Sequence, residues 1–370
     1  MKKSGHEDLR TWIEIDTKAI RYNFRSLRKS VPKNVQIMGV VKSNAYGHNL
    51  TEFAHELEKL GVDMLAVDSL VEALALRNGG IKAPILVLGY ILPENFSKAV
   101  GKNIHITISS IASLTDFLKF PRASKIPVHI KVDTGMHRQG FLLREKEIVL
   151  KMIKKGEVKV AGLYTHFASA KDPLEFAFTN RQISELELWR EAFLSAGFSV
   201  VVHAGATGGT LYFQKSHFDA VRIGAGLYGF WPEGGEPSLR PVLTWKTIIS
   251  EIKEIPAGDG IGYDLTHKAE KITRIAVCPI GYWHGYPRIL SNNAEVLVRG
   301  VRARVLGRVS MDMIVIDVTN IPRAKAGDEV VLIGKSGKEK ITANELASLA
   351  QTSPYEILTR INPLIKRIYK

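Results

Sequence analysis

Short apolar runs recur along the N-terminal two thirds of the chain, and each one ends at a turn or polar residue. Runs of this kind, rich in β-branched residues, are typical of strands that are buried on both faces. They cover Gln36–Lys42, Met64–Asp68, Ile85–Gly89, Ile104–Ser109, Val128–Asp133, Val160–His166, Ser199–Ala204 and Ala220–Arg222. The segments between them have helical spacing, as at Asn49–Leu60 and Arg181–Ala196. This alternation predicts an α/β fold, a TIM (β/α)8 barrel with a parallel sheet.

The pattern changes after the Pro- and Gly-rich stretch Pro232–Pro241. Strand-like runs then recur without long helices between them, at Lys246–Glu254, Ile272–Val277, Ala294–Val298, Val301–Val305, Met313–Val318 and Glu329–Leu332. Helical spacing returns only near Thr342–Ala350 and Tyr355–Ile361. We therefore expect a barrel over residues 10–240 and an all-β domain over residues 241–370.

The composition is typical of a soluble globular protein: 45% of the 370 residues are hydrophobic and 24% are charged. The single cysteine, Cys278, excludes an internal disulfide and a multi-cysteine zinc site, and no spacing suggests any other metal site. The charged segment Met1–Arg10 lacks the apolar run of a signal peptide, and no apolar stretch is long enough to span a membrane. The expected location is the cytoplasm, without a membrane partner.

A formal net charge of +14 raises the question of nucleic-acid binding. The 51 basic residues are interspersed with 37 acidic ones, and the densest basic runs, Lys151–Lys159 and Lys335–Lys340, contain no aromatic residue for base stacking. We therefore expect no nucleic-acid partner. A surface that attracts small anionic molecules explains the charge with fewer assumptions.

Barrel enzymes collect their catalytic groups at the C-terminal ends of the strands. Lys42 ends the apolar run Ile37–Val41, and an amine that is partly desolvated in a barrel mouth is suited to imine formation. The alternative is a lysine that extends into solvent, which the position alone does not exclude.

Two glycine-rich segments follow the last two predicted barrel strands, 205–210 and 224–226, the second directly after Arg222 and Ile223. Barrels frequently bind phosphate with these loops, because glycine lets backbone N–H groups approach an anion; the alternative is two flexible loops. Arg138 follows the fifth strand and could bind a carboxylate through two parallel hydrogen bonds, or could be a solvated loop residue. Together these features indicate pyridoxal 5'-phosphate (PLP) and an amino-acid substrate.

The segment Val40–His48 closely resembles the PLP-lysine signature of the alanine racemase family. The resemblance extends over essentially the whole chain, through Lys131–Met136, Thr165–Ala168, Val221–Gly224, Gly281–Arg288 and Gly307–Asp312. It implies a PLP-binding barrel followed by a β-domain, to which residues 1–15 are joined. It also implies a racemase that interconverts L-alanine and D-alanine, the latter for peptidoglycan.

The resemblance assigns two catalytic bases: Lys42, which would also carry PLP, and Tyr263 in the segment Gly260–Tyr263. Arg222 would face the pyridine nitrogen of PLP, and His166 would link Tyr263 to Arg222. Arg138 would orient the cofactor phenolate and the substrate carboxylate. Further matches are Lys131 beside Arg138 (carbamylated in some members), the phosphate-binding positions Tyr46, Thr207, Gly224, Ala225 and Tyr355, the entrance residue Tyr282, and Met311 and Asp312 in the β-domain.

Racemisation needs a base on each face of Cα, because one lysine cannot easily reach both faces. A permanently cationic Arg222 would keep the pyridine nitrogen unprotonated and weaken the electron sink, which would suppress side reactions such as transamination. In the family the tyrosine comes from the other subunit, so the resemblance implies a homodimer with shared active sites.

The chain departs from the family pattern at four places. Ala206-Thr207 replaces Asn-Ser in a phosphate loop, Trp283-His284 replaces Ala-Asp beside Tyr282, Asp264 replaces a common glycine, and Lys171 replaces an aspartate. None of these removes a proposed catalytic group, but the second leaves serine or broad-specificity racemisation open. Two competing functions are weaker: a decarboxylase on the same plan would need a catalytic cysteine in the β-domain, and a non-catalytic PLP-binding protein would lack the β-domain.

Overall fold

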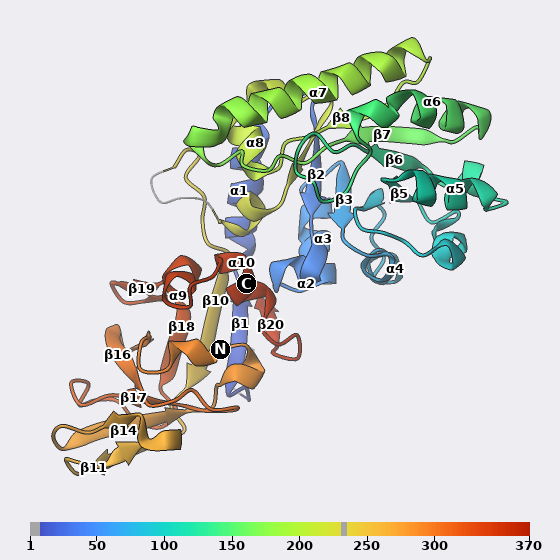
Figure 1. The fold of residues 1–370 in the computed structure, drawn as a ribbon. Helices are drawn as coiled ribbons and strands as arrows, with labels where there is room; N and C mark the ends of the chain where they lie inside the picture. Colours follow the sequence, from blue (N-terminus) through green and yellow to red (C-terminus); the bar gives the residue numbers. More distant parts are fainter. Residues whose placement is uncertain (1–7, 231–234) are drawn as a thin grey trace. The chain divides into compact units, whose positions relative to one another are not determined.

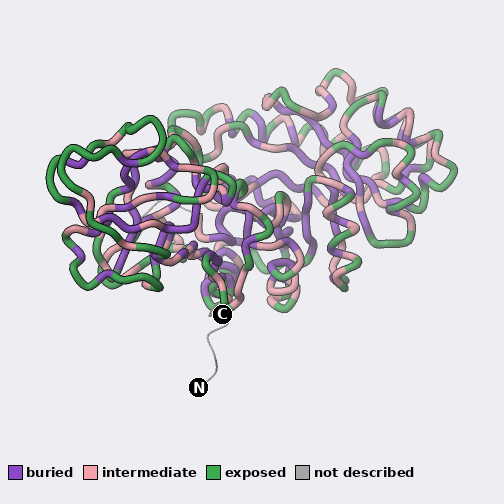
Figure 2. Tube along the Cα trace, turned by 90° about the horizontal axis from the view of Figure 1, so that it is seen from below, coloured by how far each residue is buried: buried purple, intermediate pink, exposed green. Residues whose placement is uncertain are grey.

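The computed structural model describes residues 8–230 and 235–370, which form two compact units (Figure 1). The barrel unit consists of Ala19–Ala45 and the described part of Leu50–Pro241. The β unit consists of Val242–Lys370, Tyr46–Asn49 and the described residues up to Lys18. In each unit the buried residues lie in the interior and the exposed ones follow the outer loops (Figure 2). In the described segments, no helix combines the length and apolar character required of a transmembrane span.

The barrel unit contains a closed barrel of eight parallel strands, as the hydrophobic runs predict. The strands are β2 (Gln36–Val40), β3 (Met64–Val67), β4 (Ile85–Val87), β5 (Ile104–Ile108), β6 (Val128–Lys131), β7 (Val160–Tyr164), β8 (Val201–His203) and β9 (Ala220–Ile223). The barrel closes where β2 pairs with β9, with Gln36 opposite Ala220 and Gly39 opposite Ile223. Most strand residues are buried, because the barrel interior and the surrounding helices cover both faces of the sheet.

Helices surround this barrel (Figure 1). They are α1 (Thr17–Lys29), α3 (Leu50–Lys59), α4 (Leu70–Asn78), α5 (Ile111–Lys119), α6 (Lys146–Lys155), α7 (Phe176–Ser195) and the short α8 (Thr207–Tyr212). The predicted helix Asn49–Leu60 is observed as α3, whereas the helix predicted from Arg181 begins earlier, at Phe176, directly after the turn Pro173–Glu175. Helices α4 and α5 each begin with a capping box, Ser69 with Glu72 and Ser110 with Ser113.

The β unit is built on a large, mostly antiparallel sheet in the order β11-β14-β17-β16-β15-β18-β10-β1-β20, with β19 on β18. Its strands are β1 (Thr11–Ile15), β10 (Leu243–Ile248), β11 (Glu251–Ile255), β14 (Thr273–Cys278), β15 (Glu295–Val298), β16 (Val301–Leu306), β17 (Ile314–Asp317), β18 (Glu329–Ser336), β19 (Glu339–Ile341) and β20 (Arg367–Tyr369). A separate hairpin joins β12 (Gly260–Ile261) to β13 (His267–Lys268). The helical segments near the C-terminus are α9 (Ala343–Leu349) and α10 (Pro354–Thr359).

Strand β1 brings the N-terminal segment into this sheet, where it pairs antiparallel with β10 and parallel with β20. The prediction of one continuous strand over Lys246–Glu254 is wrong. The segment divides into β10, which pairs with β18, and β11, which pairs with β14. The break lies at Ile249 and Ser250, whose backbone N–H groups donate to Asp328 and Val277. A hydrophobic run alone does not show which neighbour each half pairs with.

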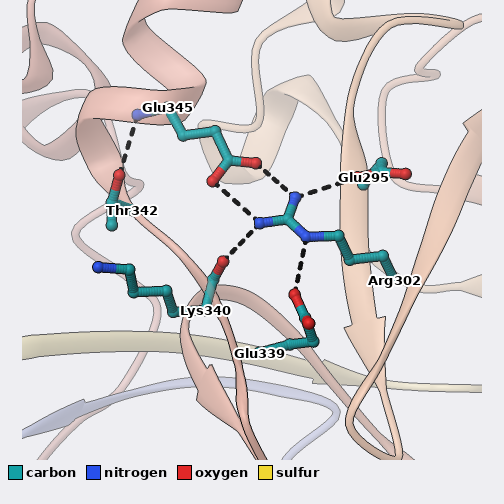
Figure 3. A network of polar contacts seen from close by, with 6 residues as sticks. All are labelled: Glu295, Arg302, Glu339, Lys340, Thr342 and Glu345. Carbon is teal, nitrogen blue, oxygen red and sulfur yellow. Dashed lines mark hydrogen bonds and ion pairs between the residues drawn. The ribbon is translucent and has the colours of Figure 1, made fainter.

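A polar network around Arg302 ties β16 to its surroundings within the β unit (Figure 3). The guanidinium donates to Glu295 on β15, to Glu339 on β19 and to both carboxylate oxygens of Glu345 on α9. It also donates to the carbonyl of Lys340 at 2.7 Å. These hydrogen bonds raise the pKa of Arg302, and they join three strands and a helix through one side chain.

Candidate active site

Lys42 lies where the first barrel strand ends, in a left-handed turn. Strand β2 ends at Val40, earlier than predicted, and Lys42 begins the short segment α2 (Lys42–Tyr46). Ser43, Asn44 and Ala45 have φ values of 56°, 55° and 50°, which is the left-handed region that non-glycine residues rarely adopt. The Lys42 amine lies 3.6 Å from the Asp68 carboxylate, at the end of the neighbouring strand β3.

Arg222 on β9 is buried inside the barrel and hydrogen-bonded through both terminal nitrogens of its guanidinium. It donates to the carbonyl groups of His203, Thr165 and Ala204 at 3.0, 2.6 and 2.8 Å. It also contacts one ring nitrogen each of His203 and His166, at 2.7 and 3.3 Å. Burial lowers the pKa of Arg222 to about 10, so the side chain stays cationic at neutral pH.

Three buried or half-buried histidines form a row that ends at Arg222. His105 Nδ1 lies 3.0 Å from His129 Nε2, and His129 Nδ1 lies 2.8 Å from His203 Nε2. The residues come from β5, β6 and β8, so the row crosses the barrel interior. His105 and His129 are not among the residues predicted from the sequence. The available signal was a histidine at the second position of each apolar strand, and it did not show that the rings meet.

Cations gather at the same end of the barrel as Lys42. Burial lowers the pKa of Lys131 to about 8, and the nearby charges of Arg138 and Arg222 act in the same direction. Burial also lowers the pKa of His166 to about 3, with contributions from Arg222, Arg138, Lys131 and Lys42. The His166 ring is therefore neutral at physiological pH. Lys131 donates to the Gln139 side chain at 3.0 Å, and Arg138 is exposed.

The two glycine-rich loops pack closely together. Thr207 begins α8 after β8, and its hydroxyl accepts a hydrogen bond from the Gly226 N–H at 3.1 Å. Gly224 and Ala225 lie at the start of a turn after β9 (Ala225–Tyr228). A Cβ on Gly226 would lie 2.9 Å from the Thr207 side chain, so only glycine fits this approach. The predicted Arg222, Thr207, Gly224 and Ala225 thus come together in one part of the barrel unit.

Tyr263 belongs to the β unit and lies in the loop between β12 and β13. Its side chain is 70% exposed. The hairpin is anchored by Ile261, which packs with Ile275 and Leu306, and by an ion pair between Asp264 and Arg308 at 2.7 Å. Asp264 has a φ of 59°, a conformation that explains why glycine is common there in the family pattern. The loop therefore presents an exposed phenol from a hairpin that is held in place by packing and an ion pair.

Tyr282, Met311 and Asp312 form a second group in the β unit. The backbone N–H groups of Tyr282 and Trp283 donate to the carbonyls of Ser310 and Met311, each at 3.0 Å. His284 is buried, and its Nδ1 accepts a hydrogen bond from the Gly281 N–H at 3.2 Å. The histidine thus takes a local structural role within its turn, while Trp283 and Met311 are exposed.

Tyr46 and Tyr355, two of the predicted phosphate-binding residues, lie together in the β unit. Their rings are edge to face with centroids 5.9 Å apart. Burial raises the pKa of Tyr46 to about 12, and Tyr355 contributes in the same direction. The expected link between His166 and Tyr263 joins residues of different units and stays a prediction. Within residues 8–230 and 235–370, no group of three or more His, Cys, Asp or Glu side chains could hold a metal ion.

Comparison with known proteins gives consistent matches over both units. Residues 15–232 match the family model for the alanine racemase N-terminal domain, and residues 242–369 match that for the C-terminal domain. The alanine racemases of Methylacidiphilum infernorum and Halothermothrix orenii are 42% and 39% identical to this chain. These alignments cover 98% and 97% of the chain and 93% and 97% of the relatives.

Solved structures agree with these sequence matches. The crystal structure of alanine racemase from Bacillus anthracis with bound L-Ala-P superposes with a TM-score of 0.92 at 35% identity, covering 98% of this chain and 95% of that one. Alanine racemase from Bartonella henselae with covalently bound pyridoxal phosphate gives a TM-score of 0.88 at 28% identity, covering 97% and 99%.

Proposed function

This chain belongs to the alanine racemase family, and from that premise we propose that it interconverts L-alanine and D-alanine with PLP as its cofactor. The observation that carries the proposal is the cation cluster of Lys42, Lys131, Arg138 and Arg222 around the neutral His166. A cofactor with a phosphate and a phenolate, and a substrate with a carboxylate, would balance this charge.

The donor set fits PLP in three respects. Lys42 supplies a primary amine at the end of a barrel strand, as covalent attachment requires. The close approach of Gly226 to Thr207 brings the two glycine-rich loops together, and backbone N–H groups of such loops would donate to a phosphate. Arg222 is a buried cation whose hydrogen-bond partners are carbonyl oxygens and ring nitrogens, so it would remain charged opposite a pyridine nitrogen.

When bound, PLP withdraws electrons from the substrate and makes the hydrogen on Cα acidic. In the proposed mechanism the Lys42 amine takes or returns this proton on one face, and the Tyr263 phenol acts on the other. Arg138, supported by Lys131, would orient the substrate carboxylate. Tyr46 and Tyr355 would hold the phosphate with Thr207, Gly224 and Ala225. Tyr282, Met311 and Asp312 would line the substrate side.

We further propose that the enzyme is a cytoplasmic homodimer in which Tyr263 serves the active site of the partner subunit. Exposed residues of the β unit support the proposal, because Tyr263, Leu265, Trp283, Met311 and Met313 are all large apolar or aromatic residues that are exposed in the single chain. Such exposed apolar groups are typical of protein interfaces. This part of the proposal would be refuted if the protein sediments as a monomer at low concentration and is fully active at that same concentration.

The main experiment tests cofactor and reaction together. The purified protein should absorb visible light as a lysine adduct of PLP, and borohydride should fix the cofactor onto Lys42. Interconversion of L- and D-alanine should be detected beside assays with serine, lysine and ornithine. Racemisation of serine at a comparable rate would favour a broad-specificity racemase, for which the exposed Trp283 beside Tyr282 is the relevant departure. Bound PLP without any racemisation would favour a binding protein.

A further inference from the structure

Glu72 on helix α4 lies outside the predicted set of site residues, yet its carboxylate reaches two barrel loops. Oε1 accepts a hydrogen bond from the Ser43 N–H at 2.6 Å. Oε2 accepts from the Asp68 and Ser69 N–H groups at 2.9 and 3.2 Å. Ser43 follows Lys42 directly, whereas Asp68 and Ser69 follow strand β3. One side chain thus joins the loops at the ends of β2 and β3.

Helix capping explains only part of this arrangement. In a capping box the third helical residue accepts a hydrogen bond from the backbone of the capping residue, as Glu72 does with Ser69. Helix α5 has the same motif, in which the Ser113 hydroxyl accepts from Ser109 and Ser110. The Ser113 hydrogen bonds stay within its own loop and helix, whereas Glu72 extends to the turn that carries Lys42.

That turn needs external support. Left-handed backbone is unfavourable for residues other than glycine, because Cβ crowds the following carbonyl oxygen, and Ser43, Asn44 and Ala45 all adopt it. The Asn44 side chain accepts from the Leu50 N–H at 2.9 Å, which secures the far end of the turn. The Glu72 carboxylate secures the near end, next to Lys42, and a hydrogen bond to a charged acceptor is stronger than one between neutral groups.

The same carboxylate also fixes the backbone of Asp68, whose side chain lies 3.6 Å from the Lys42 amine. Both ends of the Lys42–Asp68 pair are therefore held by one group. Loss of the Glu72 carboxylate would therefore release both the turn that carries the lysine and the backbone of its neighbouring anion.

We propose that Glu72 is a positioning residue that holds the Lys42 amine in place for PLP attachment and proton transfer. It acts through the Ser43 and Asp68 backbone and does not itself touch cofactor or substrate. The inference rests on the proposed function, because it takes Lys42 as the PLP-bearing base.

The test compares Glu72→Gln and Glu72→Asp with the matched control Ser113→Ala. The amide of Glu72→Gln keeps one acceptor oxygen but turns an N–H donor toward a backbone N–H. The shorter Glu72→Asp keeps the charge and the reach to Ser69 but not to Ser43. Ser113→Ala removes the equivalent capping box on α5, away from Lys42.

For each variant the full chain is freed of PLP, mixed with it again and reduced with borohydride, and the labelled Lys42 peptide is quantified over time. Melting temperature and kcat and KM for both isomers are measured in parallel.

Both Glu72 variants should capture PLP at Lys42 about tenfold more slowly than the unchanged protein, in proportion to the loss of one charge-assisted hydrogen bond. Their kcat should fall more than their KM rises, most clearly with D-alanine, where Lys42 is the expected first base. Ser113→Ala should lower the melting temperature while capture stays unchanged.

Normal capture in folded Glu72→Gln would overturn the inference, as would an equal loss of capture in Ser113→Ala. If a Glu72→Gln variant does not fold, normal capture by Glu72→Asp overturns it equally. If the unchanged protein captures PLP at Lys42 but racemises neither isomer, the proposed function alone is refuted.

Discussion

Arg222 Nη1 lies 2.7 Å from His203 Nδ1 in the interior of the barrel. A guanidinium carries only N–H donors, so this histidine nitrogen must accept, and the proton of the neutral ring must lie on Nε2. His203 Nε2–H then donates to His129 Nδ1, and His129 Nε2–H donates to His105 Nδ1. One arginine thus sets the proton positions of all three rings.

The first prediction concerns these proton positions. Nitrogen NMR of isotope-labelled protein at neutral pH should show three neutral rings protonated at Nε2. Burial supports neutrality, because it lowers the pKa of His105 to about 4 and the pKa of His129 and His203 well below the ordinary value. A charged ring, or one protonated at Nδ1, would contradict the assignment.

A substitution in the middle of the row should be costly. His129→Gln leaves at least one neighbouring ring nitrogen without its partner, and an unsatisfied buried polar group costs about 1–3 kcal/mol. We expect the free energy of unfolding to fall by this amount in denaturant titrations. His55→Gln is the control, because His55 is partly exposed, with its Nε2 2.9 Å from the Gly79 carbonyl and its Nδ1 4.0 Å from the Glu58 carboxylate. An equal effect of both substitutions would show that the row adds no stability of its own.

Stability should decrease as the solution becomes mildly acidic. The buried histidines bind protons less readily in the folded protein than in the unfolded chain, where the pKa is about 6.5. Below that pH the unfolded state takes up protons that the folded state excludes, at about 1.4 kcal/mol per pH unit for each such histidine. The free energy of unfolding should therefore be highest above about pH 6.5 and fall toward about pH 5. His129→Gln should reduce this slope, and a pH-independent stability across that window would contradict the prediction.

The histidine row also shows where sequence analysis reaches its limit. The barrel follows from eight apolar runs separated by helical spacing, because burial on both faces leaves a clear pattern in each strand. Whether His105, His129 and His203 meet depends on the register between strands and on which side chains point inward, and a single run shows neither. The tautomers then depend on Arg222, which is far away in the chain.

The turn after Lys42 is a second instance. None of Ser43, Asn44 and Ala45 is a glycine, so the sequence does not indicate a left-handed backbone here, and the hydrophobic pattern predicted a strand through Lys42. The Ser69–Glu72 capping box could be inferred from spacing, but the hydrogen bond from Ser43 to Glu72 depends on tertiary contact. Lys42, Arg138 and the two glycine-rich loops were candidates from their positions after barrel strands. The family resemblance supplied the other site residues and the individual roles, because lone lysines and arginines at strand ends do not distinguish catalysis from solvation.

Removal of Arg302 should destabilise the β unit. Arg302→Met would break the contacts with Glu295, Glu339 and Glu345 and leave three carboxylates close together. The side chain is 32% exposed, so solvent screens part of the effect, and we expect a loss of about 1–2 kcal/mol in the free energy of unfolding. Arg360→Met serves as control, because its ion pair with Glu356 is on an exposed helical turn. A loss no larger than in this control would mean that the network is only a solvated surface cluster.

The last prediction concerns the two faces of the substrate. Tyr263→Phe keeps the exposed ring and the hairpin, which is held by Ile261 and the Asp264–Arg308 pair, but removes the proton-bearing hydroxyl. Racemisation should fall by at least about 10²-fold, as expected when a general base is lost. Exchange of the Cα hydrogen with solvent should disappear with L-alanine but stay detectable with D-alanine, because Lys42 remains. Tyr22→Phe, on the outer helix α1, should leave both exchange rates unchanged. If Tyr263→Phe instead lost exchange equally from both isomers, the assignment of one base to each face would be wrong.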